Sequence, residues 1–216
     1  MTTSTDQLTA LSTAAVSDAL DALGLVGALH GIGPLTDTAR AVGPAFTVRY
    51  EPITDDPGTV GDFLDGVPAG AVVVIDNAGR TDCTVWGGIM TAVATAKHVA
   101  GTVVHGVCRD VASAFALGYP VFSAGRFMRT GKDRVRCVAV QQPVLISGVR
   151  IAPGDLVTAD CDGVAAVAAP HLDAVVELAE HIEHAERRIV EAVRAGSTLA
   201  QARADLGYHA LQSRTP

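Results

Sequence analysis

The feature that most constrains this chain is a continuously apolar run, AVVVIDNAG (residues 71–79), followed by a helical pattern (87–99) and a second apolar run (102–107). An apolar run that turns polar only at its end is typical of a strand buried on both faces of a sheet covered by helices. Strand, helix and strand in succession imply a βαβ crossover, with ligand sites at the carboxyl ends of the strands. The helical pattern carries apolar residues along one side: Ile89, Val93, Ala96 and Val99.

The segments before this unit predict a helix and a strand. Apolar residues at helical spacing predict a helix over 6–24 that ends at Gly24, and Ser17-Asp18 within it is a candidate cap for a second short helix. Alternation and β-branched residues predict a strand within 39–52. These elements would lie beside the central βαβ unit.

The segments after it change in character. A short helix and a strand follow the second apolar run, and residues 135–167 consist of short β-branched runs separated by turn residues. Residues 171–195 form a long amphipathic pattern that stops at Ala195-Gly196. No repeat or low-complexity linker divides the chain, so we interpret residues 1–216 as one α/β domain.

The composition indicates which classes of partner and which cellular compartment to expect. The net charge of −7 without basic runs argues against nucleic acid and anionic membranes as partners. Hydrophobic residues make up 49% of the chain and charged residues 18%, which favours an oligomer that buries apolar surface between subunits. No apolar run is long enough to cross a bilayer, and no signal peptide is evident. We expect a cytoplasmic protein.

The four cysteines are widely spaced and form no CxxC motif, so they indicate neither a zinc site nor a disulfide framework. Four reduced thiols fit the cytoplasm. Cys108 precedes an arginine and could be an activated thiol, but the sequence offers no evident base for it, so a small buried residue is the favoured interpretation. His105, in the second apolar run, is interpreted as a hydrogen-bonded histidine of the core or of a pocket edge.

A cation and an anion, Arg109 and Asp110, directly follow the second apolar run. One interpretation is a surface pair just past a strand, which contributes little. The other is a ligand site, because the pair faces the predicted start of the helix at 87–99, which opens with Trp-Gly-Gly. Glycines permit close backbone approach there, and the free N–H groups and helix dipole attract anions. The residues alone leave both interpretations open.

Two other groups have the composition of a metal site but not its pattern. His181 and His184 lie one turn apart, but glutamates flank them, and a solvated helix face is the favoured interpretation. Asp155, Asp160 and Asp162 do not match the spacing of an EF-hand loop and are better explained as turn residues.

Longer segments of the sequence carry a resemblance. The specific ones are WGGIMTAVATAKHVAGTVVHGVCRD and GVRIAPGDLVTADCDGVAAV; shorter ones are AAVSDALDALG, GIGPL, AVGPAFTV and YPVFSAG. Through them the chain resembles, over nearly its whole length, the RraA-like family. That family includes class II 4-hydroxy-4-methyl-2-oxoglutarate aldolases with oxaloacetate decarboxylase activity and the regulator of ribonuclease activity A. The resemblance implies a layered β/β/α fold like the swivelling phosphohistidine domain, with a β-rich second half and a long C-terminal helix.

The resemblance also implies roles for particular residues. Substrate is held by the four residues that open the central helix, here Gly87, Gly88, Ile89 and Met90. Arg109 also contacts substrate, and Asp110 binds a divalent cation, Mg²⁺ or Mn²⁺. A glutamate from the C-terminal helix of a neighbouring subunit completes the metal site through water, and Glu186 is the candidate by position. Family members are homotrimers, sometimes paired into hexamers.

The implied reaction is cleavage of a carbon–carbon bond in a short 2-oxo acid through a pyruvate enolate, whose charge the metal and Arg109 would stabilise. Two positions depart from the pattern: Gly88 stands where some aldolases have an acid that orients a basic water, and His105 stands where Asp is frequent. The missing acid weakens the case for aldol cleavage more than for decarboxylation. The alternative function is a non-catalytic, protein-binding regulator of RNA processing.

Overall fold

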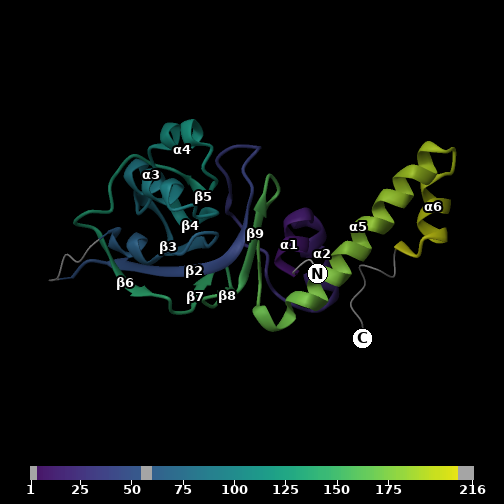
Figure 1. Cartoon of the computed structure of the whole chain (residues 1–216), viewed down its shortest axis with the longest axis horizontal. Helices are drawn as coiled ribbons and strands as arrows, with labels where there is room; N and C mark the ends of the chain where they lie inside the picture. Colours follow the sequence, from purple (N-terminus) through teal and green to yellow (C-terminus); the bar gives the residue numbers. More distant parts are fainter. Residues whose placement is uncertain (1–3, 55–59, 209–216) are drawn as a thin grey trace.

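The computed structural model describes residues 4–54 and 60–208 and shows a mixed α/β architecture with a central sheet and a long C-terminal helix (Figure 1). The main sheet has the strand order β1-β5-β4-β3-β2-β9-β10, β6 also pairs with β2, and β7 and β8 form a separate small sheet. The strands are β1 (Gly33–Pro34), β2 (Ala41–Pro52), β3 (Val72–Thr84), β4 (Gly101–Cys108), β5 (Val121–Arg126), β6 (Val135–Val140), β7 (Val144–Ile146), β8 (Val149–Ile151), β9 (Leu156–Asp160) and β10 (Gly163–Val167).

Parallel strands form the middle of the main sheet. β3 pairs in parallel with β2 and β4, and β4 pairs in parallel with β5. Helices α3 (Gly88–Ala96) and α4 (Val111–Leu117) connect β3 to β4 and β4 to β5, which confirms the predicted βαβ crossover. Residues 72–75 are fully buried because separate apolar clusters cover the two faces of the sheet.

The layers follow the β/β/α order that we expected. Figure 1 shows α3 and α4 on one side of the sheet and the hairpin β7–β8 on the other. The long strand β2 joins two parts of the sheet, because its first residues pair with β9 and its last residues pair with β6. A bulge between Arg49 and Tyr50 interrupts the pairing with β6.

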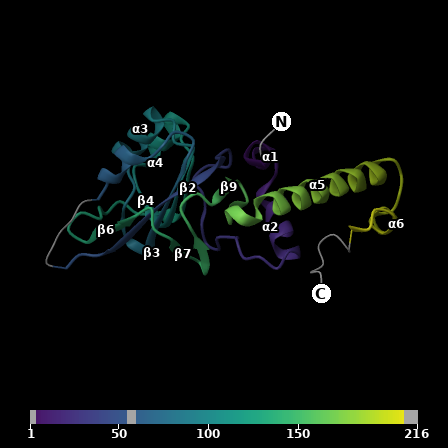
Figure 2. The same ribbon diagram turned by 60° about the horizontal axis from the view of Figure 1, so that its bottom comes forward.

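A second helical group packs beside β9 and β10. Helices α1 (Ser4–Ala10), α2 (Thr13–Ala22) and α5 (Leu172–Arg194) share an apolar cluster with these strands. The predicted amphipathic helix is confirmed as α5, but Val190 and Val193 on its apolar face are 48% and 39% exposed. Figure 2 shows the reason: the far half of α5 projects away from the sheet, and α6 (Leu199–Asp205) packs against it. No described helix combines the length and apolarity needed to span a bilayer.

The helix predicted over 6–24 is in fact two helices, and the break lies at Ser12 rather than at Ser17-Asp18. The Ser12 hydroxyl accepts a hydrogen bond from the Ala15 N–H at 3.2 Å and so caps α2, whereas Ser17 lies inside that helix. Gly24 follows α2 with a left-handed φ of 69°, as expected for a helix stop.

The apolar side expected for the central helix is only partly its buried side, because Val93 packs against a core cluster and Val99 is buried, whereas Ile89 and Ala96 are exposed. Ile89 is 84% exposed, whereas Thr91 and Ala94 are buried and Val99 lies beyond the end of α3. Thr91 can be buried because its hydroxyl has two hydrogen-bond partners, the Trp86 indole and the Gly87 carbonyl. Side-chain pairing therefore places Thr91 on the buried side of this short helix, next to the apolar residues that pack there.

Asp160, at the end of β9, links the second helical group to the sheet. Its carboxylate accepts hydrogen bonds from the Thr13 N–H (2.9 Å), the Thr13 hydroxyl and the Asp162 N–H (3.0 Å), and the Arg40 guanidinium lies 3.8 Å away. Burial alone would raise the pKa of this carboxyl, but the hydrogen bonds outweigh burial and place the pKa of Asp160 below its ordinary value.

Asp160→Asn should flatten the acid denaturation profile. A depressed folded-state pKa means that the charged carboxylate stabilises the fold above the unfolded-state pKa of about 4, and this stabilisation disappears as the pH falls through the folded-state pKa. We expect the free energy of unfolding at pH 7 to fall by about 1–3 kcal/mol, measured by urea titration over a pH series. Asp162→Asn, an exposed neighbour, is the matched control. Parallel pH profiles for Asp160→Asn and the unmutated chain would contradict the assignment.

Candidate active site

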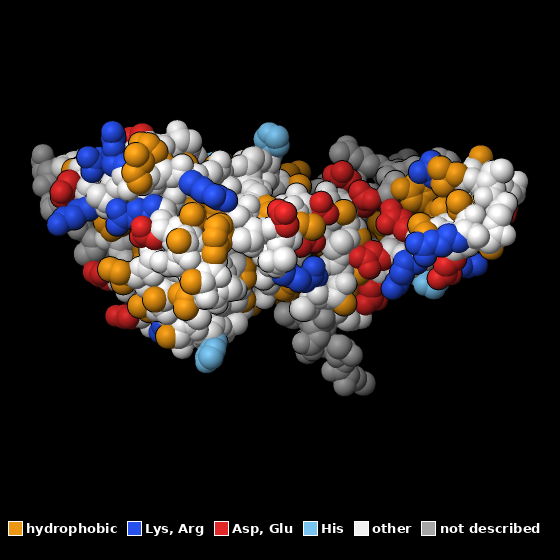
Figure 3. Space-filling model, turned by 90° about the horizontal axis from the view of Figure 1, so that it is seen from above, with side chains coloured by type: hydrophobic (Ala, Val, Ile, Leu, Met, Phe, Trp, Pro, Cys, Tyr) orange, Lys and Arg blue, Asp and Glu red, His pale blue; other side chains and the backbone are white. Residues whose placement is uncertain are grey.

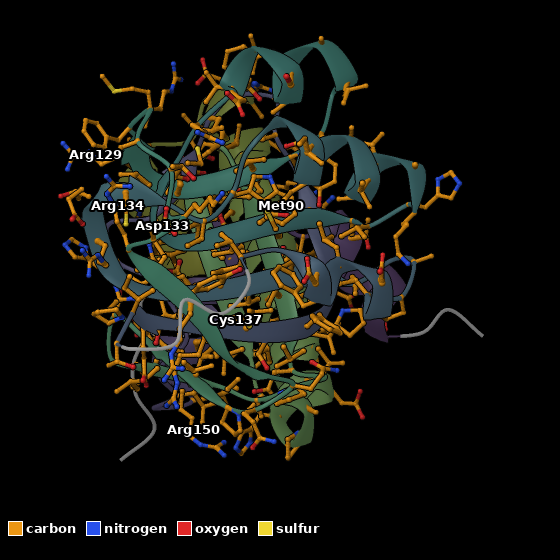
Figure 4. The ribbon with its side chains drawn as sticks, turned by 90° about the vertical axis from the view of Figure 1, so that its left-hand side faces the viewer. Met90, Arg129, Asp133, Arg134, Cys137 and Arg150 are labelled. Carbon is orange, nitrogen blue, oxygen red and sulfur yellow. The ribbon has the colours of Figure 1, made fainter. Side chains whose placement is uncertain are left out.

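A pocket of about 290 Å³ opens where β3 and β4 end, beside the start of α3. Its walls come from residues 60–61, 84–90, 109–110 and Thr130. Figure 4 views this end of the molecule, with Met90 near the middle of the picture. The structure thus gathers the substrate residues expected at 87–90 and the Arg109-Asp110 pair around one cavity, at the sheet edge where α/β proteins hold ligands.

The backbone of Asp110 directs its side chain. Asp110 has a left-handed conformation (φ 57°, ψ 36°), which is uncommon for a residue with a side chain, and it lies between β4 and α4. The preceding Arg109 N–H donates to the Trp86 carbonyl at 3.1 Å, which holds this turn against the segment that enters α3. The Asp110 carboxylate accepts a hydrogen bond from the Gly88 N–H, with 2.9 Å between N and Oδ2.

The two glycines make this close approach sterically feasible. A Cβ atom on Gly87 would lie 2.9 Å from Asp110 Oδ2 and 3.2 Å from Arg109 Nε, and one on Gly88 would lie 3.1 Å from the Ser113 hydroxyl. Gly87 itself has no side chain to cap α3, so Asp110 caps the helix from a position 22 residues away from Gly88 in the sequence. The hydrogen bond from the Gly88 N–H to Asp110 therefore both caps α3 and brings Asp110 to the pocket.

The start of α3 retains the capacity to bind an anion. Among the described residues, no acceptor contacts the N–H groups of Ile89 and Met90, which lie at the positive end of the helix. Arg109 Nε lies 3.6 Å from Asp110 Oδ2, and these two side chains remain 39% and 49% exposed. The pocket thus presents N–H donors and a guanidinium beside a carboxylate.

Further positive charge lies around Thr130, although the chain as a whole has a net charge of −7. Lys and Arg side chains gather at the same end of the molecule in Figure 3, and Figure 4 labels Arg129 and Arg134 there. The cations of this segment are Arg126, Arg129, Lys132, Arg134 and Arg136. Such a local potential favours an anionic ligand over a neutral one.

Asp110 is the single carboxylate among the described residues that line the pocket. Its Oδ2 accepts the Gly88 N–H, and within the described structure no donor contacts its Oδ1. Mg²⁺ is commonly held by one or two carboxylates and completes its shell with water and ligand oxygens. The donor set therefore fits a hard divalent cation. The ligand atoms of Asp160, Cys161 and Asp162 also lie together, but outside this pocket, and Asp160 already binds Thr13.

Two residues considered at the sequence level do not line the pocket. Glu186 lies on α5, at the opposite end of the molecule from α3 (Figure 1), and its Oε1 lies 3.5 Å from the Tyr208 hydroxyl. Its expected role on a neighbouring subunit stays a prediction. His105 Nδ1 lies 2.9 Å from Asp76 Oδ1, which confirms a hydrogen-bonded histidine.

The remaining candidates have ordinary structural roles. Cys108 is 1% exposed, and burial raises the pKa of its thiol despite a contact with the Ser123 hydroxyl, so it is not an activated thiol. His181 and His184 are exposed on α5. The Asp155 carboxylate accepts backbone N–H bonds on either side of β9 and β10, as a turn residue does.

Sequence reasoning missed one wall of the pocket, which Thr84, Thr130 and residues 60–61 form. Thr84 and Thr130 come together because the Gly131 N–H donates to the Thr84 carbonyl at 2.8 Å. Neither threonine belongs to a motif, and their pairing depends on a contact between distant segments. No local signal in the sequence indicates it.

Comparison with known proteins gives one family. Residues 13–166 match the RraA-like (Aldolase/RraA) family. The chain is 44% identical over 206 residues to protein DlpA of Legionella pneumophila. This match covers 94% of this chain and 33% of DlpA, so the chain spans about a third of that relative's length. It is 34% identical to a putative 4-hydroxy-4-methyl-2-oxoglutarate aldolase of Halalkalibacterium halodurans over 163 residues, 74% of each chain. A crystal structure of an uncharacterized Pseudomonas syringae protein superposes with a TM-score of 0.87 at 46% identity, covering 93% of this chain and 96% of that one.

The cap on α3 predicts a difference between two substitutions of Asp110. Asp110→Ala should lower the free energy of unfolding by about 1–3 kcal/mol, because the Gly88 N–H loses its acceptor and alanine tolerates the left-handed backbone (φ 57°) less well than Asp or Asn. Asp110→Asn should lose less than half of that, because its amide oxygen can accept the same hydrogen bond. Urea denaturation at pH 7 measures both values. Equal losses in the two variants would show that the carboxylate charge, rather than the hydrogen-bond acceptor, stabilises the start of α3.

Proposed function

Because the chain belongs to the RraA-like family, we propose that it is a divalent-metal-dependent lyase acting on short 2-oxo acids. The reaction would be cleavage of 4-hydroxy-4-methyl-2-oxoglutarate, decarboxylation of oxaloacetate, or both, through a pyruvate enolate. The observation that carries this proposal is the Arg109-Asp110 pair, with Asp110 bound to the Gly88 N–H at the open end of α3. The aldolase named among the relatives supports the reaction class.

The proposed substrate-binding residues are Gly87, Gly88, Ile89, Met90 and Arg109. A substrate carboxylate would accept hydrogen bonds from the N–H groups of Ile89 and Met90, since these donors have no acceptor in the described structure. The side-chain-free backbone at 87–88 gives the substrate close access to Arg109. The pocket volume of about 290 Å³ suits a molecule of this size.

Arg109 and Asp110 would carry the chemistry. Breaking the bond between C3 and C4, one carbon beyond the 2-oxo carbon, would release CO2 or a second 2-oxo acid and leave its electron pair in the enolate, whose oxygen the Arg109 guanidinium would stabilise. Asp110 would hold Mg²⁺ or Mn²⁺ through its uncommitted oxygen, and the bound cation would polarise the 2-oxo group. Glu186 of a neighbouring subunit, acting through water, is the proposed second contributor in a homotrimer or a hexamer.

Gly88 bears on the choice between the two reactions. Aldol cleavage requires a base to remove the hydroxyl proton, whereas decarboxylation does not. The position that carries a water-orienting acid in some aldolases is Gly88 here, and a Cβ atom there would lie 3.3 Å from Asp110 Cβ. We therefore expect oxaloacetate to be the better substrate of the two.

Substitutions at the pair should abolish pyruvate formation. With oxaloacetate, Mg²⁺ and a lactate-dehydrogenase-coupled assay, we expect Arg109→Ala and Asp110→Asn to reduce kcat/KM by about 100-fold or more. EDTA should remove the activity of the unmutated chain, and added Mg²⁺ or Mn²⁺ should restore it. Because Asp110→Asn retains an acceptor for the Gly88 N–H, its loss reports on charge and metal binding rather than on folding.

Arg150→Ala, on the hairpin β7–β8, is the control for loss of a surface arginine, and an enzyme-free reaction corrects for spontaneous decarboxylation. Full activity in both site variants would refute the assignment of Arg109 and Asp110 as the reacting site, and full activity in EDTA would refute the metal dependence. If none of a panel of 2-oxo acids yields pyruvate, with or without metal, the result would favour the protein-binding regulator instead.

A further inference from the structure

Behind the glycines that open α3 lies a buried pair of side chains, Trp86 and Thr91, which are 2% and 1% exposed. The Trp86 indole N–H donates to the Thr91 hydroxyl oxygen, with 3.0 Å between Nε1 and Oγ1. The same hydroxyl donates to the Gly87 carbonyl at 3.1 Å, and the Thr91 N–H donates to that carbonyl at 3.0 Å. The hydroxyl is thus held between a ring and a single peptide group.

That peptide group is the one that reaches Asp110. The Gly87 carbonyl and the Gly88 N–H belong to one planar peptide and point in opposite directions. Fixing the carbonyl toward Thr91 therefore aims the N–H at Asp110 Oδ2, 2.9 Å away. Thr91 does not line the pocket, yet it sets the orientation of the hydrogen bond that places the Asp110 carboxylate.

Trp86 is itself fixed from several sides. Its ring stacks on Tyr119, with 6.2 Å between centroids and 11° between planes. Its carbonyl accepts hydrogen bonds from the Thr84 hydroxyl (3.0 Å) and from the Arg109 N–H (3.1 Å). Trp86 therefore holds the Thr91 hydroxyl through its ring and the Arg109 turn through its backbone.

We infer that Trp86 and Thr91 are positioning residues for the pocket, and that the hydrogen-bonded chain from indole to hydroxyl to Gly87 carbonyl keeps the Asp110 carboxylate in place. A threonine hydroxyl that bonds the carbonyl one turn earlier is common in helices. Here that hydroxyl also satisfies a buried indole N–H, which sets its rotamer and the direction of its own proton. This inference rests on the proposed lyase function for its catalytic readout.

The sequence supplies a second readout, because Trp86 is the single tryptophan of the chain. Its indole lies next to the glycines that would bind substrate, so ligand binding can be followed by its emission without any turnover. Oxalate with Mg²⁺ is a suitable probe, since one of its carboxylates matches that of the pyruvate enolate, the other takes the place of the enolate group, and the molecule undergoes no cleavage.

The test compares Thr91→Val with Thr91→Ser. Valine keeps the shape of threonine and removes both hydrogen bonds, whereas serine retains the hydroxyl. Thr47→Val is the matched control, because Thr47 is equally buried on β2, donates its hydroxyl to the Gln142 carbonyl, and does not line the pocket. Thermal unfolding of all the variants separates loss of stability from loss of function.

We expect Thr91→Val to lower kcat for pyruvate formation by about 10- to 100-fold and to weaken oxalate binding about tenfold. Thr91→Ser should return both values to within about threefold of the unmutated chain, and Thr47→Val should leave both unchanged. Equal kcat and oxalate affinity in Thr91→Val and Thr47→Val would overturn the positioning role. If neither the unmutated chain nor any variant forms pyruvate but oxalate binding still follows this order, the lyase fails and the positioning role stands.

Discussion

The hydrogen bond between the Gly88 N–H and the Asp110 carboxylate is the interaction on which the pocket depends. It joins the end of β4 to the start of α3, satisfies a helix-end donor, and fixes a charged oxygen beside Arg109. Its geometry requires the bare backbone of Gly87 and a left-handed conformation at Asp110. An uncommon backbone conformation of this kind persists only where its surroundings hold it, and such residues cluster at functional sites.

Those surroundings provide two kinds of support. The outer support is the parallel sheet, whose strands β3 and β4 are buried between two apolar clusters and cannot shift without opening the core. The inner support is polar and specific, because Trp86 and Thr91 fix peptide groups that apolar packing alone would leave free to rotate. Non-directional burial holds the strands, and directional hydrogen bonds hold the charges that they carry.

The sequence predicts the parts of this structure that depend on local pattern. The apolar runs gave β3 and β4, and the chain order placed Arg109 and Asp110 opposite the glycines of α3. The break at Ser12 and the exposure of Ile89 were not predictable in the same way, because one depends on a competing cap and the other on a partner for Thr91. The wall at Thr84 and Thr130 escaped prediction, since contact between distant segments leaves no local pattern.

The divided pairing of β2 has a consequence for synthesis of the chain. Segments 72–126, which supply most of the pocket, are contiguous and can pair as they emerge from the ribosome. The first residues of β2, from Ala41 to Pro44, pair with β9, which is made only in the last third of the chain. Until then β2 presents an open strand edge, the kind of surface that recruits other chains. Truncation before β9 would therefore leave the pocket segments complete but the nascent protein prone to aggregate.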